Sequence, residues 1–395
     1  ANTGMANPGS FADYMSLLST LFLRLIKMII APLVFSTLVV GIAKMGDAKE
    51  VGRIGLKALG WFIIASVISL SLGLLLVNLF RPGDALTVAV PAADAASGIA
   101  TSSLTLKEFI THLVPSSIVD GMAKNEILQI VVFSLFFGTA AAAVGPRAHP
   151  MIEAIDGVAH VMLKVTGYVM NLAPIAVFAA VSGTIASKGL GVLSTFGIFM
   201  GEFYLGIILL WVVLTMAGFM FLGKRVFGLL KELREPTLLA FSTASSEAAF
   251  PKTLEGLERF GVKNRIAAFV LPVGYSFNLD GSMMYCTFAT VFIAQAYGIE
   301  MDLGTQIVMM AVLMLTSKGM AGVPRASLVV IAATLTQFNI PEAGLLLLLG
   351  IDHFLDMARS ATNVIGNGIA TAVVAKWENE LTDPTKKDVA TAPLQ

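Results

Sequence analysis

Long apolar runs constrain the fold of this chain more than any other feature. Four of them occupy residues 17–40, 58–80, 158–181 and 193–222. Each is at least as long as the roughly 20 residues that a helix needs to cross a bilayer. The chain is 56% hydrophobic and only 13% charged, whereas ordinary globular domains carry about 25% charged residues. The predicted fold class is therefore an all-α polytopic membrane protein.

The remaining composition excludes several classes of function. Lys plus Arg and Asp plus Glu both number 26, so the net charge is zero and no nucleic-acid partner is expected. Cys286 is the only cysteine, and the four histidines show no metal-ligand spacing. We expect neither an internal disulfide nor a cofactor.

The distribution of basic residues predicts the orientation. Lys44, Lys49, Arg53 and Lys57 follow the first apolar run, whereas residues 82–106 contain no basic residue before Lys107. By the positive-inside rule, 44–57 is cytoplasmic and 82–106 is external. Residues 1–15 then lie outside, which predicts that one more helix precedes Ala1.

The second half of the chain repeats one layout twice. In the first unit, residues 242–247 break an apolar run, and a span over 266–297 follows with a polar interruption at 278–281. In the second unit, residues 316–324 separate the apolar runs 307–315 and 328–335. Each half is too short to cross about 30 Å of hydrocarbon, so we predict two re-entrant hairpins that enter from opposite sides. Paired interruptions of this kind point to the binding site of a transporter.

A polar helix follows the second hairpin, over residues 350–376. At about 100° per residue its polar groups share one face within roughly 100° of arc. These groups are Asp352, Asp356, Arg359, Ser360, Asn363 and Asn367. A charge at the bilayer centre costs at least about 2.5–3.5 kcal/mol, so this face either pairs internally as a structural seam or binds something.

The chain breaks in the two units carry further candidate groups. Ser242–Glu247 offers hydroxyls and free backbone N–H groups that suit a carboxylate, although a simple Ser-rich turn is the alternative. Gly319–Pro324 offers free carbonyls and hinge-like glycines that suit a cation or a gate, although a simple hairpin turn is the alternative. Asn278 and Asp280 supply oxygens for a monovalent cation or a proton, unless Asp280 is merely structural. Glu247 in an apolar site suits a proton carrier, unless it faces a vestibule.

Four motifs together resemble the dicarboxylate/amino-acid:cation symporter family (the glutamate transporter family). They are AFSTASSE at 240–247, GYSFNLDG at 274–281, TSKGMAGVP at 316–324 and LDMARSATNVIGN at 355–367. Within that family the chain looks closest to bacterial proton-coupled glutamate/aspartate symporters. The resemblance covers about residues 17–380. It implies a glutamate-transporter-like fold, a homotrimer, and a transport domain that moves like an elevator against a static scaffold.

The resemblance also implies the domain organisation. The scaffold comprises 1–57 with its first helix at 17–43, a broken helix in 107–150, and a helix in 151–188. The transport domain comprises a helix and external loop in 58–106, a helix in 189–225, the first hairpin with the NLDG helix in 226–300, and the second hairpin with the polar helix in 301–380. Residues 381–395 form a cytoplasmic tail, and the family's first helix lies upstream of Ala1.

Two sets of site residues follow from the resemblance. The substrate-binding set is Ser245, Ser246, Gly322, Val323, Asp356, Arg359, Ser360 and Asn363. In this set Arg359 grips a substrate carboxylate and Asp356 pairs with a substrate amino group. The set for cation or proton coupling is Glu247, Ser276, Asn278, Asp280, Asp352 and Asn367. A sodium ion could bind at Asn278, Asp280 and Asn367.

Departures from the family pattern favour protons over sodium. Sodium-coupled members have Asp where this chain has Asn367, and Tyr and Thr where it has Phe62 and Ala65. The side-chain oxygens of Ser66 and Ser276 are retained. A desolvated cation needs such oxygens, whereas a proton needs only a carboxylate. Glu247 is the first candidate to carry it.

The leading prediction is a proton-coupled symporter that imports glutamate or aspartate across the bacterial inner membrane, with a cytoplasmic C-terminus. Asp356 favours amino acids, because the dicarboxylate branch of the family typically has Ser there. The alternatives are a symporter of C4-dicarboxylates (succinate, fumarate or malate), sodium coupling, a channel, and an intramembrane aspartyl enzyme. Arg359 disfavours the enzyme because it would hold the Asp352 and Asp356 carboxylates ionised.

Overall fold

The computed structural model describes residues 8–45, 48–84, 90–93, 111, 114–188, 196–317 and 326–382. Within these ranges the regular structure is helical, and one isolated bridge between Val262 and Leu381 is the only β pairing. The N-terminal half contains α1 (Pro8–Met45), α2 (Ala48–Phe80), α4 (Ile118–Ala123), α5 (Ile127–Val144), η1 (Gly145–Ala148), α6 (His149–Met170), α7 (Ala173–Lys188) and α9 (Gly197–Leu222). The predicted all-α class is confirmed.

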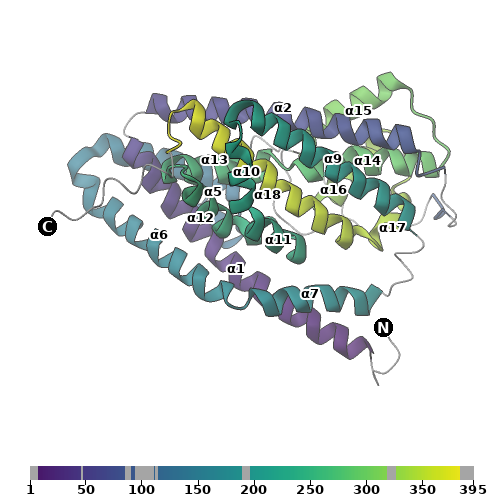
Figure 1. Ribbon diagram of the computed structural model, residues 1–395, viewed down its shortest axis with the longest axis horizontal. Coiled ribbons are helices and arrows are strands. Elements are labelled where there is room, and N and C mark those ends of the chain that lie inside the picture. Colours follow the sequence, from purple (N-terminus) through teal and green to yellow (C-terminus); the bar gives the residue numbers. More distant parts are fainter. Residues whose placement is uncertain are drawn as a thin grey trace.

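The C-terminal half consists of shorter helices that surround one long one. They are α10 (Arg225–Glu232), α11 (Arg234–Thr243), η2 (Glu247–Ala249), α12 (Phe250–Phe260), α13 (Asn264–Phe277), α14 (Asp280–Ala296), α15 (Leu303–Thr316), α16 (Ala326–Gln337), η4 (Glu342–Gly344), α17 (Leu345–Leu349) and α18 (Asp352–Trp377). In Figure 1, α18 runs through the middle of the molecule. It packs against α9, α11, α13 and α14.

Four segments are long and apolar enough to cross a membrane: Phe11–Ala43, Lys49–Phe80, Ile127–Met170 and Gly197–Leu222. The first two contain the first two apolar runs noted in the sequence, and the last covers residues 197–222 of the run at 193–222. The predicted span at 158–181 is divided between α6, which ends at Met170, and α7, which begins at Ala173, and Asn171 and Pro174 mark a kink there in the sequence. The chain is thus a multi-pass membrane protein.

Two layers of helices are visible in Figure 1. The long α1 packs along α5, α6 and α7, and of these α6, α7 and the N-terminal part of α1 lie along the lower edge of the view. On the opposite side, α2 packs along α14 and α13. The division into a scaffold and a transport domain stays a prediction.

The first predicted chain break is present in the structure, and the second lies largely outside the described residues. In the first unit α11 ends with Ala244 in the left-handed region (φ 50°), and the short η2 leads into α12. In the second unit α15 and α16 contact each other, and the tip that joins them, 318–325, lies outside the described residues. The polar interruption at 278–281 separates α13 from α14.

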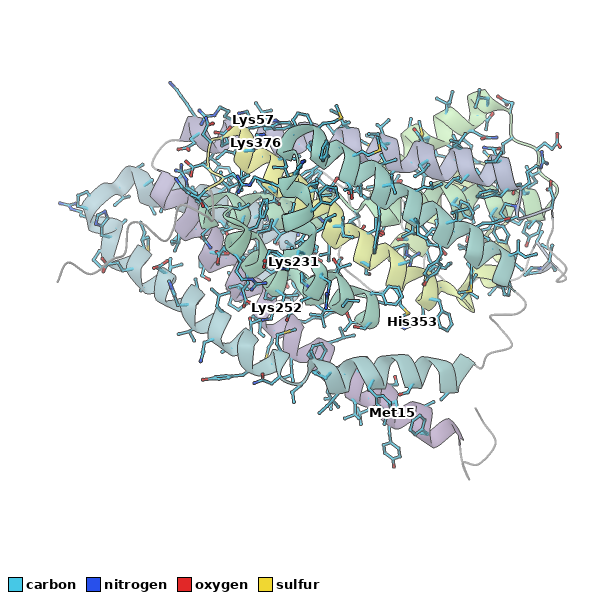
Figure 2. The ribbon with its side chains drawn as sticks, in the orientation of Figure 1. Met15, Lys57, Lys231, Lys252, His353 and Lys376 are labelled. Carbon is cyan, nitrogen blue, oxygen red and sulfur yellow. The ribbon has the colours of Figure 1, made fainter. Side chains whose placement is uncertain are left out.

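Ion pairs tie the C-terminal end of α18 to the start of α2. The Glu378 carboxylate lies 2.6 Å from the Arg53 guanidinium and 2.7 Å from the Lys57 ammonium. Lys57 also donates to the carbonyl of Trp377 at 3.1 Å. Figure 2 shows Lys57 and Lys376 at this end of α18 and His353 at the other end. The last turn of α18 therefore lies beside the basic segment that the charge pattern predicts to be cytoplasmic.

This contact has a testable pH dependence. The hydrogen bond from Arg53, with a further contribution from Lys57, lowers the pKa of Glu378. A carboxylate with a lowered pKa stabilises the folded state above its ordinary pKa, and that contribution is lost as pH falls through the lowered value. Because Arg53 is largely exposed, we expect Glu378→Gln to cost about 0.5–1 kcal/mol at pH 7, or about 1–3 °C in Tm.

Thermal melts in detergent at several pH values measure this effect. The difference between wild type and Glu378→Gln should shrink as pH falls below the ordinary pKa of a glutamate and vanish once the carboxylate is protonated. Glu153→Gln, on the exposed face of α6, is the matched control and should change Tm little at any pH. A difference that persists unchanged in acid would show that the ion pair is not its cause.

Candidate functional site

The charged groups of α18 form one buried cluster around Arg359, which is 1% exposed. Its Nη2 lies 3.1 Å from Asp352 Oδ1 and 2.9 Å from Asp356 Oδ1. The guanidinium carbon sits 4.0 Å above the centre of the Tyr285 ring, an attractive cation–π geometry. Nη1 of Arg359 donates no hydrogen bond to any of the described residues. The cluster therefore holds one guanidinium with a spare donor in an apolar interior.

Local sequence explains how this cluster forms. Asp356 and Arg359 are three residues apart, and Asp352 is one further turn away, so all three side chains project from one face of α18. Gly281 allows α14 to come close, because a Cβ there would lie 2.6 Å from the carbonyl oxygen of Arg359. Tyr285 is four residues after Gly281 and lies on the same face of α14. Its hydroxyl donates to Asp352 Oδ1 at 3.3 Å.

A second polar cluster lies further along α18. Asn278 Nδ2 donates to Asp280 Oδ2 at 3.0 Å and to Asn367 Oδ1 at 3.4 Å. Ser69 on α2 donates to Asp280 Oδ1 at 3.1 Å. Gly366 keeps this space open, because a Cβ there would collide with Asp280 Oδ2. Three of the predicted coupling residues, Asn278, Asp280 and Asn367, are thus brought together.

Asn363 joins α18 to the start of α14. Its Oδ1 accepts a hydrogen bond from the backbone N–H of Gly281 at 3.0 Å, and its Nδ2 donates to Ser282 Oγ at 3.4 Å. This amide satisfies a backbone donor in the first turn of α14, which has no partner within its own helix. In this structure Asn363 therefore orients α14 against Arg359. Ser360, its neighbour one turn back, is 5% exposed.

Glu247 lies apart from the Arg359 cluster. It lines a small cavity with apolar residues of α1, α5, α12 and α13, among them Val34 and Pro272. Tyr275 of α13 also faces this cavity. The lining includes no residue of α18. The prediction that Glu247 sits in the first hairpin holds, but the structure directs it toward α1 rather than toward the charged face of α18.

The remaining predicted residues are placed as follows. Ser245 Oγ accepts a hydrogen bond from the backbone N–H of Ala248 at 3.3 Å, inside the first hairpin. Ser246 directly precedes η2, and Ser276 is a buried residue near the end of α13. Gly322 and Val323 lie outside the described residues. No cluster of three or more His, Cys, Asp or Glu that could hold a metal is found in the described part of the chain.

Sequence reasoning missed three residues of these clusters. Tyr285 supplies both the ring under Arg359 and a hydrogen bond to Asp352, yet it lies inside an apolar helix with no local signal. Ser282 contacts Asn363. Ser69 donates a hydrogen bond to Asp280. Ser69 follows Ser66 by about one helical turn on α2, and this spacing could have identified it from the sequence.

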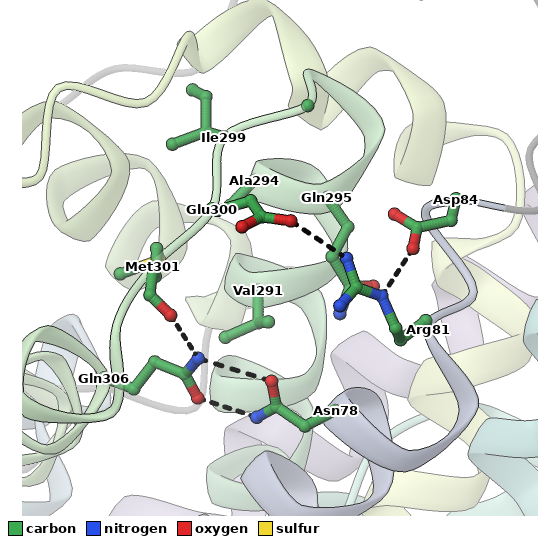
Figure 3. Close-up of a pocket in the computed structure, with 11 residues that line it drawn as sticks. Asn78, Arg81, Asp84, Val291, Ala294, Gln295, Ile299, Glu300, Met301 and Gln306 are labelled. Atoms are coloured by element: carbon green, nitrogen blue, oxygen red, sulfur yellow. Dashed lines mark hydrogen bonds and ion pairs between the residues drawn. The ribbon is translucent and has the colours of Figure 1, made fainter.

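A separate polar pocket of about 180 Å³ lies where α2, α14 and α15 meet (Figure 3). It contains none of the predicted site residues. Asn78 and Gln306 exchange hydrogen bonds at 2.7 and 3.3 Å. Arg81 lies 2.5 Å from Asp84 and 3.7 Å from Glu300. Because these polar groups pair with one another, the pocket fastens α15 to α2 and α14 rather than offering free donors.

Substitution of Gly281 tests the close packing of α14 on α18. A methyl group there would meet the Arg359 backbone at 2.6–2.8 Å, so one helix must shift. We expect Gly281→Ala to weaken substrate binding at least about tenfold, because shifts of this size misplace Tyr285 and Arg359. Gly60→Ala is the control, since nothing lies within 4 Å of a Cβ at Gly60. Equilibrium binding to purified protein measures both. Wild-type affinity in Gly281→Ala would contradict the proposed packing.

Known proteins resemble the chain over most of its length. It is 43% identical over 368 residues to a C4-dicarboxylate transport protein of Citrifermentans bemidjiense, covering 91% of this chain and 83% of that one. It is 42% identical over 367 residues to a C4-dicarboxylate transport protein of Geobacter sp. (strain M21), with the same shares. It is 40% identical over 382 residues to a proton/sodium-glutamate symport protein of Geobacillus stearothermophilus, covering 95% of this chain and 90% of that one.

These relatives overturn the prediction that the chain imports acidic amino acids. Seven of them, 41–43% identical, are named C4-dicarboxylate transport proteins. The prediction rested on Asp356 as the partner of a substrate ammonium. In the structure Asp356 lies 2.9 Å from Arg359, so its charge already has a partner within the chain and requires no ammonium.

The resemblance noted in the sequence is confirmed at the level of the family. The sequence pattern of the sodium:dicarboxylate symporter family matches residues 3–377. Its members are symporters, so the chain is a transporter and not an enzyme, and its substrate is a small acidic molecule. With four motifs, a helical membrane fold and relatives at 40–43% identity in agreement, the chain belongs to the sodium:dicarboxylate symporter family.

Proposed function

We propose that this protein imports C4-dicarboxylates such as succinate, fumarate or malate. The observation that carries the proposal is the buried Arg359, whose Nη1 donates no hydrogen bond within the described residues. A guanidinium holds a carboxylate through two parallel hydrogen bonds. The names of the seven relatives support a dicarboxylate as the anion.

Binding uses the two ends of the substrate differently. One carboxylate accepts a hydrogen bond from Nη1 of Arg359. A charge-assisted hydrogen bond is strong there because little water competes. The second carboxylate has the hydroxyls of Ser360, Ser245 and Ser246 as candidate donors. Asp352 stays on Arg359, since both side chains are 1% exposed and Tyr285 donates to Asp352.

Protons drive the import in this proposal. Phe62 supports it, because its ring lies 3.4 Å from the Cβ position of Gly274, beside Asn367, and brings carbon where a sodium ion needs oxygen. Asn367 contributes an amide oxygen without net charge. Glu247 is the first candidate for the carrier, because a carboxylate among apolar neighbours crosses a membrane most easily when it is protonated.

The proposal includes placement and assembly. The protein lies in the bacterial inner membrane in contact with lipid, and its C-terminus is cytoplasmic because Glu378 pairs with the basic start of α2. It works as a homotrimer in which the C-terminal helices carry the substrate past a static scaffold.

Uptake by purified protein in liposomes tests the proposed function. Labelled succinate should accumulate when the interior is more alkaline than the medium, in the absence of sodium. Excess fumarate or malate should block this uptake. Strict dependence on sodium, with no response to the pH gradient, would overturn the coupling. Failure of all three dicarboxylates to bind would overturn the substrate assignment.

A further inference from the structure

The charge of the Arg359 cluster has a consequence for substrate binding. Two carboxylates, Asp352 and Asp356, face one guanidinium, so the cluster carries a formal charge of −1 when both are ionised. A C4-dicarboxylate brings two more negative charges and no ammonium. Like charges a few ångströms apart in a dry site repel strongly. The loaded site therefore needs a further positive charge.

The two carboxylates are not equivalent. Asp352 is 1% exposed and accepts a hydrogen bond from Tyr285 as well as from Arg359. The side chain of Asp356 is 20% exposed and shares the Nε and Nη2 donors of Arg359. An incoming carboxylate that binds Nη1 and Nη2 of Arg359 competes with Asp356 for Nη2 and displaces it, because Asp352 is enclosed and held from two sides.

We propose that Asp356 takes up one proton when a C4-dicarboxylate binds, and releases it when the substrate leaves. This inference rests on the proposed function. The proton comes from water on the entry side. The substrate carboxylate replaces Asp356 on Arg359, and the resulting neutral carboxyl group donates its O–H to the substrate. The only covalent change is the O–H bond that Asp356 gains from a hydrated proton of the medium, and the charge of the loaded site is one unit less negative than it would be with Asp356 ionised.

Among the described residues, few other titratable groups face this pair. Tyr204 on α9 and Tyr285 and Cys286 on α14 interact electrostatically with Arg359. A hydroxyl or a thiol is neutral at pH 7 and cannot supply the missing positive charge. On α18 itself, His353 is three residues before Asp356 and lies at the same end of the helix (Figure 2).

The charged residues of α13 and α11, two other helices packed on α18, lie toward its C-terminal end. Arg265 on α13 pairs with Glu380, beyond the C-terminal end of α18. Leu233, which directly precedes the charged start of α11, contacts the Gly368 position, nearer the C-terminal end of α18. Within the Arg359 cluster, Asp356 is thus the more accessible of the two acids.

Asp356 and Glu247 have separate tasks in this scheme. Glu247 belongs to the first hairpin and faces α1, whereas Asp356 belongs to α18 and faces Arg359. One proton on each neutralises the two charges of the substrate. Substrate binding and proton binding are then linked at the Arg359 cluster itself, in addition to the proton on the hairpin.

The test counts protons taken up on binding, using full-length purified protein in nanodiscs. Fumarate is the probe, because both of its carboxylates stay ionised over the working range of about pH 6.5–8.5. Calorimetry in two buffers of different ionisation enthalpy yields the proton number directly. The dissociation constant should rise about tenfold per pH unit for each linked proton. The variants are Asp356→Asn and the matched Glu247→Gln.

We expect Asp356→Asn to take up about one proton fewer than wild type, with a correspondingly flatter pH dependence. Glu247→Gln should still take up the Asp356 proton. An unchanged proton number in Asp356→Asn, or no uptake at all in Glu247→Gln, overturns the inference. The proton number of Glu247→Gln tests the inference even if Asp356→Asn fails to fold. If the wild-type protein binds neither fumarate nor succinate at any pH, the proposed function itself is wrong.

Discussion

Replacement of Arg359 by Ala is expected to abolish dicarboxylate binding over the usable concentration range. The substitution leaves Asp352 and Asp356 without their shared cation and the substrate carboxylate without its donor. Truncating one partner of a buried charge pair costs about 2–5 kcal/mol, which corresponds to a loss of about 30-fold to several thousand-fold in affinity. Calorimetry with fumarate measures the dissociation constant directly.

Arg359→Lys separates charge from geometry. Lysine keeps the positive charge but lacks the planar fork that holds two oxygens at once and lies flat over the Tyr285 ring. Binding should therefore be intermediate between wild type and Arg359→Ala. Because both variants alter a buried cluster, their Tm values and elution profiles must show folded protein. Wild-type affinity in folded Arg359→Ala would remove this residue from the substrate site.

Much of the charged face could be predicted because helical spacing is a local property. The positions of Asp352, Asp356, Arg359 and Asn367 along one face follow from 3.6 residues per turn, and the structure places them there. The breaks at 242–247 and 278–281 were predictable for a similar reason, since polar residues and Gly interrupt apolar runs.

What the sequence could not supply are contacts between helices far apart in the chain. Tyr285 meets Arg359 only because Gly281 lets α14 approach α18. The sequence left open whether Asp356 pairs with Arg359 or awaits a ligand, and in this structure it pairs. The predicted substrate was wrong for that reason. Asp356 was matched to a substrate ammonium before its pairing with Arg359 was known.

Glu247→Gln is expected to reduce net uptake driven by a pH gradient at least about tenfold, with Asp356 as the remaining coupling site, while leaving exchange of bound substrate largely intact. Glu247 lies in the first hairpin against α1, near the ammonium of Lys27 and the carboxylate of Glu126, and away from Arg359. The substitution therefore removes a proton carrier without touching the anion site. Gln mimics the protonated carboxyl in size and neutrality, so the loaded protein can still move its substrate across.

Two liposome assays distinguish these effects. In the first, succinate accumulates against its gradient when the lumen is alkaline, and the rate should fall at least about tenfold in Glu247→Gln, because the empty and loaded forms no longer differ by this proton. In the second, unlabelled succinate inside the liposomes exchanges for labelled succinate outside, and the rate should stay within about threefold of wild type, since exchange requires no net proton movement.

Glu126→Gln is the matched control for this experiment. Glu126 precedes α5 and interacts electrostatically with Glu247 across the same region. Its replacement alters the local charge equally but leaves the hairpin carboxylate in place, so both assays should resemble wild type. Pumping at the wild-type rate in Glu247→Gln would show that Glu247 carries no coupling proton. Loss of exchange together with pumping would mean that Glu247 supports substrate binding instead, because a neutral side chain there would then fail at a step that needs no proton.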